Sequence, residues 1–161
     1  MPIKPWLYLE TTIPSYLVAR PSSDVRLLAD QQATKEWWEQ RRRDFDLFVS
    51  QVVIAEAGRG DVRLAAARLE VLRGIALLDP SPAGEELAQR LLVEGILPPM
   101  AADDAAQLGF AAAHGLEYLL TWNCRHSNNR ALERRIERAC AACGLACPVS
   151  ATPTELMNPE P

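Results

Sequence analysis

Short apolar segments alternate with amphipathic helical patterns along nearly the whole chain, and this alternation constrains the fold more than any other feature. Such an order is typical of a parallel sheet that helices cover on both faces. The sequence therefore predicts an α/β protein. The candidate strands are residues 6–9, 45–49, 75–78, 118–121 and 146–149, and the candidate helices are 13–19, 25–42, 52–59, 61–72, 82–94, 101–114 and 130–142.

The length and composition indicate one domain. A chain of 161 residues buries roughly 68–70% of its unfolded surface and can form one sizeable core. We expect that domain to span residues 1–152, followed by a C-terminal turn and tail over 153–161. No segment approaches the roughly 20 apolar residues of a membrane span, and the start lacks an apolar run of signal-peptide length. We therefore expect a cytoplasmic protein with no membrane partner.

Three acidic residues lie beside short apolar runs. Glu10 and Glu56 each follow such a run directly, Asp104 precedes another, and Asn123 follows the run that ends at Thr121. A buried carboxylate is costly unless it is paired, neutralised or bound to a metal. Because ligands of parallel sheets bind beyond the carboxyl ends of the strands, these groups can converge there. Oxygen ligands suit Mg²⁺ or Mn²⁺, and a metal in such a site often serves phosphodiester hydrolysis.

Four segments carry a resemblance to a known family. They are YLETTIPSYL at 8–17, VVIAE at 52–56 with Gly60 and Asp61, AADDA at 101–105 and LLTWNCRH at 119–126. Their order along the chain resembles the successive motifs of a PIN domain. The resemblance implies a three-layer α/β/α fold with a five-stranded parallel sheet. It also implies a Mg²⁺- or Mn²⁺-dependent ribonuclease of the kind seen in VapC toxins of type II toxin–antitoxin pairs.

The same resemblance assigns roles to individual residues. Glu10, Glu56 and Asp104 map onto the first three acids of the metal site, and Asn123 maps onto a position where the family often carries a fourth acid. All four are expected to serve catalysis, in which metal-activated water attacks the phosphate and no protein nucleophile is needed. Thr11 maps onto a small hydroxyl residue beside the first acid.

Two departures from the family pattern affect the expected metal site. Glu10 stands where most PIN domains have Asp, and the extra methylene displaces its oxygens by about a bond length. Asn123 lacks the charge of a fourth acid, and ligand charge count governs the affinity for hard cations. One tightly held cation is therefore expected.

Two neighbouring acids compete for the third position of the metal site. Successive residues of a helix point about 100° apart, so only one of Asp103 and Asp104 can face the core side. Asp104 is assigned because it shares a face with Leu108, Ala111 and Ala112, whereas Asp103 suits the positive end of the helix dipole.

Substrate binding would require positive charge near the acids, since phosphate contacts supply most of the affinity for nucleic acid. Arg130 recurs at helical spacing with Arg134 and Arg138, although Glu133 and Glu137 on the same helix equally suit a solvated, ion-paired face. The candidate substrate-binding residues are Thr11, Thr121, Arg125, His126 and Arg130.

Two classes of function stay open. The first is a metal-dependent endoribonuclease with an RNA substrate, acting as a toxin that an antitoxin protein silences. The second is a PIN-like module, catalytically weak or inactive, that binds RNA or a protein partner, and it is motivated by Glu10 and Asn123. Homodimerisation is compatible with either. A formal charge of −4 argues against a uniformly basic coat for nucleic acid but leaves room for a local basic patch.

Overall fold

Parallel strands form the centre of the molecule. The computed structural model describes residues 3–123 and 130–158, and within them a five-stranded sheet has the order β3–β2–β1–β4–β5. Every neighbouring pair is parallel. The predicted α/β fold with a five-stranded parallel sheet is therefore confirmed. The strands are β1 (Trp6–Leu9), β2 (Asp46–Val49), β3 (Ala76–Leu77), β4 (Tyr118–Leu120) and β5 (Val149–Ala151).

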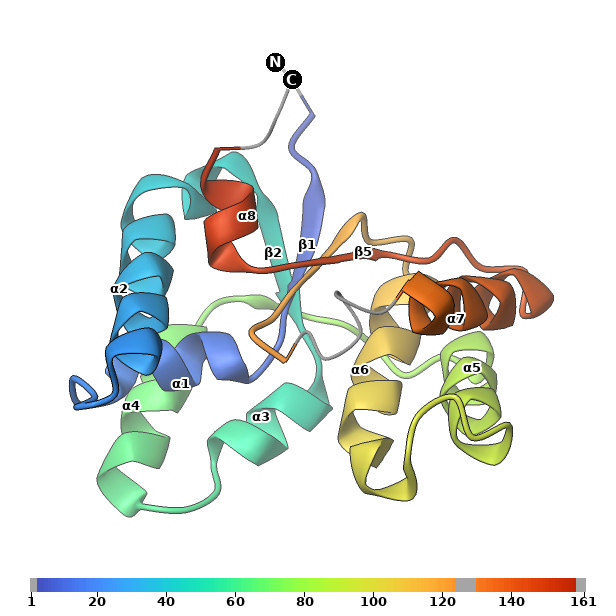
Figure 1. Ribbon diagram of the computed structural model, residues 1–161, viewed down its shortest axis with the longest axis horizontal. Helices are drawn as coiled ribbons and strands as arrows, with labels where there is room; N and C mark the ends of the chain where they lie inside the picture. Colours follow the sequence, from blue (N-terminus) through green and yellow to red (C-terminus); the bar gives the residue numbers. More distant parts are fainter. Residues whose placement is uncertain (1–2, 124–129, 159–161) are drawn as a thin grey trace.

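Helices cover both faces of the sheet and make three layers (Figure 1). One layer holds α1 (Thr12–Val18), α2 (Val25–Gln40), α4 (Val62–Leu72) and α8 (Pro153–Met157). The other holds α5 (Pro82–Val93), α6 (Ala102–Ala113) and α7 (Arg130–Ala142). The helix α3 (Gln51–Ala57) touches both α4 and α6, and two short 3₁₀ turns, η1 (Arg42–Asp44) and η2 (Pro99–Ala101), complete the elements. Over the described part of the chain, no helix combines the length and apolar character needed to cross a membrane.

Several predicted helix starts carry the caps that the sequence indicates. Asp24, Asp61 and Ser81 each accept a backbone N–H from the first turn of the following helix. Pro82 occupies the first turn of α5, where its missing N–H costs nothing. These local signals explain why the predicted helix boundaries lie within a few residues of the observed ones.

The C-terminal part of the chain differs from the sequence prediction in two places. The last strand was expected at 146–149 but runs from Val149 to Ala151, because Pro148 has no N–H to donate to the sheet. Residues 153–157 were expected as part of a turn and tail, yet they form α8. Thr152 and Glu155 make reciprocal hydrogen bonds at its start, and Leu156 is buried.

The central strand, β1, is the strand from which the sheet is extended first on one side and then on the other. Leu7, Tyr8 and Leu9 are fully buried, as expected for a strand covered on both faces. The chain proceeds from β1 through β2 to β3 on one side, then returns to build β4 and β5 on the other. The gap beyond the ends of β1 and β4 is thus the switch point at which open α/β sheets bind ligands.

A close backbone contact between Gly84 and Gly109 allows α6 to pack tightly against α5. A Cβ atom at Gly109 would collide with the carbonyl oxygen of Gly84, and one at Gly84 would lie 2.7 Å from the carbonyl oxygen of Gly109. Only the absence of both side chains lets the two helix backbones approach this closely. Because α6 carries Asp104, this contact also fixes the position of that acid.

The substitution Gly109→Ala should therefore destabilise the protein. Forcing a methyl group into packed backbone costs about 1–3 kcal/mol, and we expect a matching loss in the free energy of unfolding measured with urea. Gly58→Ala is the matched control, since its added Cβ would lie 3.5 Å from the nearest atom, an ordinary contact. Equal stability of the two variants would contradict this account of the α5–α6 contact.

Candidate functional site

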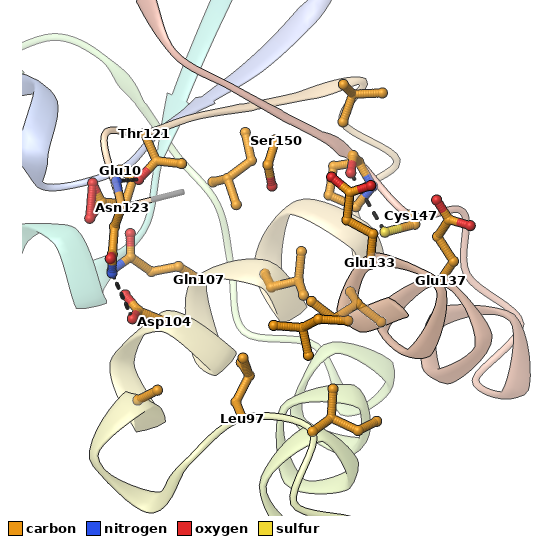
Figure 2. Close-up of a pocket in the computed structure, with 18 of the residues that line it drawn as sticks. Glu10, Leu97, Asp104, Gln107, Thr121, Asn123, Glu133, Glu137, Cys147 and Ser150 are labelled. Atoms are coloured by element: carbon orange, nitrogen blue, oxygen red, sulfur yellow. Dashed lines mark hydrogen bonds between the residues drawn. The ribbon is translucent and has the colours of Figure 1, made fainter. Parts of the chain in front are cut away.

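A cavity of about 610 Å³ opens at the switch point, beside α6 and α7. Figure 2 shows polar side chains grouped at one end of it and the acids of α7 at the other. Apolar residues such as Leu97, Leu108 and Ile136 also line the cavity. The polar residues at the β1 end are Glu10, Asp104, Gln107, Thr121 and Asn123, and those at the α7 end are Glu133, Glu137 and Cys147.

Glu10 is the buried acid at the end of the central strand. Its side chain is only 6% exposed, and its Oε2 accepts hydrogen bonds from the Thr12 N–H (2.7 Å) and the Thr12 hydroxyl (2.5 Å). The pKa of Glu10 is raised from its usual 4.5 to about 7, mainly by burial and in part by the negative charge of Asp104, and the hydrogen bonds from Thr12 and Thr121 oppose this shift by favouring the ionised form. The site therefore stabilises a proton or a cation at this carboxylate.

Asp104 is the second acid at this end of the cavity. It lies in the first turn of α6, and its Oδ2 accepts a hydrogen bond from Asn123 Nδ2 at 2.9 Å. Asp103 points elsewhere: it forms an ion pair with Arg59 at 3.4 Å, its side chain is 49% exposed, and it does not line the cavity. Of the two neighbouring acids, the structure brings Asp104 to the cavity.

The segment Thr121–Asn123 follows β4. Trp122 attaches it to the helix layer that contains α1 and α2. Its backbone N–H donates to the Thr12 hydroxyl at 2.9 Å, and its indole Nε1–H donates to the Thr34 hydroxyl at 2.7 Å. The indole also stacks on Tyr16, with ring centroids 5.9 Å apart. Because the Thr12 hydroxyl also donates to Glu10, Trp122 helps to fix the orientation of that acid.

The two other members of this segment face the cavity. Thr121, which is 2% exposed, accepts a hydrogen bond from the Asn123 N–H at 2.8 Å. The Asn123 side chain extends toward Asp104 and donates a hydrogen bond to it (Figure 2). Thr121 thus forms hydrogen bonds with both Glu10 and Asn123.

Glu56 does not join these acids at the cavity. It is half-buried on α3, and its Oε1 accepts hydrogen bonds from the Thr11 hydroxyl (3.0 Å) and Gln107 Nε2 (2.6 Å). Burial raises the pKa of Glu56, and the negative charges of Asp103 and Asp104 act in the same direction. The cavity lining lacks Glu56, because Thr11 and Gln107 hold its carboxylate to one side.

Two of the three carboxylates that were expected to converge line the same cavity. Across residues 3–123 and 130–158, no three His, Cys, Asp or Glu side chains form a group that could hold a metal ion. Glu10 and Asp104 line one cavity, whereas Glu56 lies outside its lining and accepts a hydrogen bond from Gln107. A metal ligated by all three acids remains a prediction from the resemblance.

The predicted substrate-binding residues are placed in different surroundings. Thr121 lines the cavity, whereas Thr11 contacts Glu56 and lies outside the lining. Arg130 is exposed at the start of α7 and does not line the cavity. Arg125 and His126 lie outside the described residues.

Sequence reasoning missed Gln107, the polar residue that links Glu56 to the cavity. Gln107 is 1% exposed and follows Asp104 by one helical turn. The available signal was a long polar side chain on the apolar face of a helix that begins with an acid. Such a residue is unusual in a core and indicates a specific hydrogen-bonding role.

The oxygen atoms at the β1 end of the cavity are of the kinds that bind hard divalent cations. Glu10 and Asp104 supply carboxylates, Thr121 a hydroxyl, and Asn123 and Gln107 amide oxygens. Gln107 Oε1 is buried and has no hydrogen-bond partner among the described residues. Mg²⁺ and Mn²⁺ prefer oxygen ligands of these kinds, whereas zinc sites usually include histidine or cysteine.

Comparisons with known proteins agree with a PIN-like α/β/α fold. Neither the protein-family models nor the curated proteins that were searched contain a match. Among solved structures, the chain is similar to one chain of VapBC2 from Rickettsia felis, crystallised bound to a DNA fragment from their promoter. The TM-score is 0.57, the sequence identity is 14%, and the alignment covers 91% of this chain and 97% of that chain. At this identity the similarity establishes the fold.

The buried carboxylate of Glu10 should make the stability of the metal-free protein fall as pH rises. Its folded pKa of about 7 exceeds the usual 4.5, so folded Glu10 keeps a proton that the unfolded chain has released. The contribution of Glu10 to stability is largest below its unfolded pKa and is lost as the pH rises to its folded pKa. The loss totals about 3 kcal/mol, since each pKa unit is worth about 1.4 kcal/mol.

Urea unfolding of chelator-treated protein between pH 4.5 and 8 measures this dependence. The variant Glu10→Gln keeps an oxygen acceptor for Thr12 but cannot ionise, so its stability should depend less steeply on pH across the same interval. An unchanged slope in the variant would show that another group causes the pH dependence.

Proposed function

We propose that this protein is a Mg²⁺- or Mn²⁺-dependent endoribonuclease that hydrolyses RNA phosphodiester bonds. The observation that carries the proposal is the pair Glu10 and Asp104 at the switch point, surrounded by neutral oxygen donors in a cavity large enough for a nucleotide. The PIN-like fold and the likeness to a VapBC2 chain support the same assignment.

The charge of the cavity explains why a cation would be required. The described lining contains the carboxylates of Glu10, Asp104, Glu133 and Glu137 and includes no Lys, Arg or His. A phosphodiester would be repelled by such a surface, because like charges in a partly buried site interact strongly. A cation between the acids and the phosphate would convert this repulsion into attraction.

The side chains of the β1 end have distinct tasks in the proposed reaction. A bound Mg²⁺ or Mn²⁺ would lower the pKa of a bound water and offset charge on the phosphate. Glu10 and Asp104 would hold the cation with their carboxylates. Thr12 fixes the Glu10 carboxylate through two hydrogen bonds, and Asn123 fixes that of Asp104 through one.

An antitoxin protein is the proposed partner. The VapBC2 neighbour is a chain of a complex, which supports a protein partner for this chain as well. The apolar stretch between two acidic ends of the cavity suits a peptide segment with a basic side chain that reaches the acids. A second copy of the chain is proposed as a further partner, since homodimerisation is compatible with either class of function.

One observation favours the alternative of a binding module that does not cut RNA. Glu56 is held to one side of the cavity, and the described residues include no three-acid cluster. With Asn123 in place of a fourth acid, the cavity would then bind RNA or a protein segment without hydrolysis. Mn²⁺ binding and RNA cleavage separate the two functions.

Asp104→Asn should weaken both metal binding and cleavage. Removing one of the two carboxylates at the β1 end of the cavity should lower the affinity for Mn²⁺ by roughly tenfold or more, because ligand charge sets the affinity for hard cations. Calorimetric titration of chelator-treated protein and Mn²⁺-dependent cleavage of total RNA are the measurements. Asp103→Asn is the matched control, since its exposed ion pair with Arg59 contributes little. Wild-type cleavage by Asp104→Asn would refute the proposal, and Mn²⁺ binding without cleavage would favour the binding module.

Asn123→Asp should strengthen cation binding and weaken the metal-free fold. The new carboxylate would face Asp104 where the amide now donates a hydrogen bond of 2.9 Å, replacing attraction by repulsion. We expect a lower melting temperature without metal, and roughly tenfold tighter Mn²⁺ binding or a second bound ion. Unchanged Mn²⁺ affinity and stoichiometry would place residue 123 outside the cation site.

A further inference from the structure

We propose that Gln107, and not Glu56, supplies the third oxygen ligand of the cation at the Glu10–Asp104 end of the cavity, while Glu56 orients the Gln107 amide. The inference rests on the proposed metal-dependent function, because it names a ligand of that same site. It assigns Gln107 to metal binding and makes Glu56 a positioning residue.

The first support is the location of Gln107. Its side chain is 1% exposed, yet it lines the cavity together with Glu10 and Asp104. Asp104 and Gln107 are separated by three positions on α6, so they lie on the same face of that helix. Figure 2 shows the Gln107 side chain extending from α6 toward the end of the cavity that holds Glu10 and Asn123.

The hydrogen bond to Glu56 determines which way the amide faces. The Gln107 Nε2 donates to Glu56 Oε1 at 2.6 Å, which is the orientation that a carboxylate acceptor favours. The Gln107 oxygen is then the atom directed away from Glu56. The Thr11 hydroxyl donates to the same Glu56 oxygen at 3.0 Å and holds the carboxylate in place.

The Gln107 oxygen is left without a partner. Oε1 is buried and accepts no hydrogen bond from any described residue. A buried acceptor in this state costs about 1–3 kcal/mol, and native proteins rarely retain one without a function or a bound species. A cation beside Glu10 and Asp104 would satisfy it, because an amide oxygen is a good ligand for Mg²⁺ and Mn²⁺.

The carboxylate of Glu56, in contrast to the Gln107 oxygen, has hydrogen-bond partners. One of its oxygens already accepts two hydrogen bonds, and the residue does not contribute to the cavity lining. Both bonds go to Glu56 Oε1 and hold the carboxylate beside Thr11 and Gln107. The arrangement instead lets Glu56 act indirectly, by fixing the amide of Gln107, which lines the cavity together with Glu10 and Asp104.

The test is calorimetric titration of the full-length, chelator-treated protein with Mn²⁺. Gln107→Met has a similar length but lacks the amide, and it should bind Mn²⁺ at least about tenfold more weakly than the wild type. Glu56→Gln keeps an oxygen that can accept from Thr11 and Gln107, and its affinity should change by less than about threefold. A loss in Glu56→Gln as large as or larger than that in Gln107→Met would overturn the inference, since it would mark Glu56 as a direct ligand.

A double variant that exchanges the two side chains also tests whether residue 107 or residue 56 is the ligand, and it keeps one amide and one carboxylate at these positions. In Glu56→Gln/Gln107→Glu, the amide and the carboxylate trade places, so a hydrogen bond between the two positions can form again. If residue 107 is the ligand, the exchange brings a negative charge to the cation and Mn²⁺ binds more tightly than in the wild type. Weaker binding than in the wild type would show that the carboxylate was needed at position 56. Because this variant keeps the paired groups, it decides the question even where Gln107→Met fails to fold.

The outcomes also separate this inference from the proposed function. Saturable Mn²⁺ binding by the wild type, with affinities unchanged in Gln107→Met and in the exchange variant, would refute the role of Gln107 and leave the metal-dependent function standing. Such a result would mean that water alone satisfies the buried oxygen. An absence of Mn²⁺ binding by the wild type would refute both.

Discussion

The burial of the Glu10 carboxylate at the end of the central strand is the constraint on which the rest of the site depends. A charge in that position is costly, and the surrounding structure offsets the cost with hydrogen bonds from Thr12 and Thr121. The hydroxyl of Thr12 in turn accepts from Trp122, so the loop after β4 and the start of α1 are fixed by the same group. The geometry of the cavity therefore follows from how one buried acid is accommodated.

The fold was largely predictable because its signals are local. Leu7, Tyr8 and Leu9 form a continuous apolar run that suits a strand buried on both faces, and Asp24 and Asp61 cap their helices within the first turn. Of the two errors in the C-terminal part of the chain, the missed helix is the one that depends on distant contacts. The helix α8 is only five residues long, and such a short segment depends on packing against α2.

The candidate site was predictable only in part. Placement of Glu10 and Asp104 at one cavity follows from the position of an acid after the central strand and of another at the start of a buried helix. The position of Glu56 depends on Gln107, which is 51 residues away in the sequence, and no periodic pattern reveals a hydrogen bond between such distant residues. The resemblance identified which acids belong to the region but not which oxygen atoms face the cavity.

Two features of the site reduce the stability of the metal-free protein. One is the ionisation of Glu10 in a buried position, and the other is the Gln107 oxygen, which has no hydrogen-bond partner within residues 3–123 and 130–158. Apolar residues could replace both side chains in a core that served stability alone, and proteins generally retain such costs where activity requires them. Both costs lie at the same end of one cavity, and a single cation would relieve both. This coincidence is the strongest physical reason to regard the end of the cavity at β1 as a binding site.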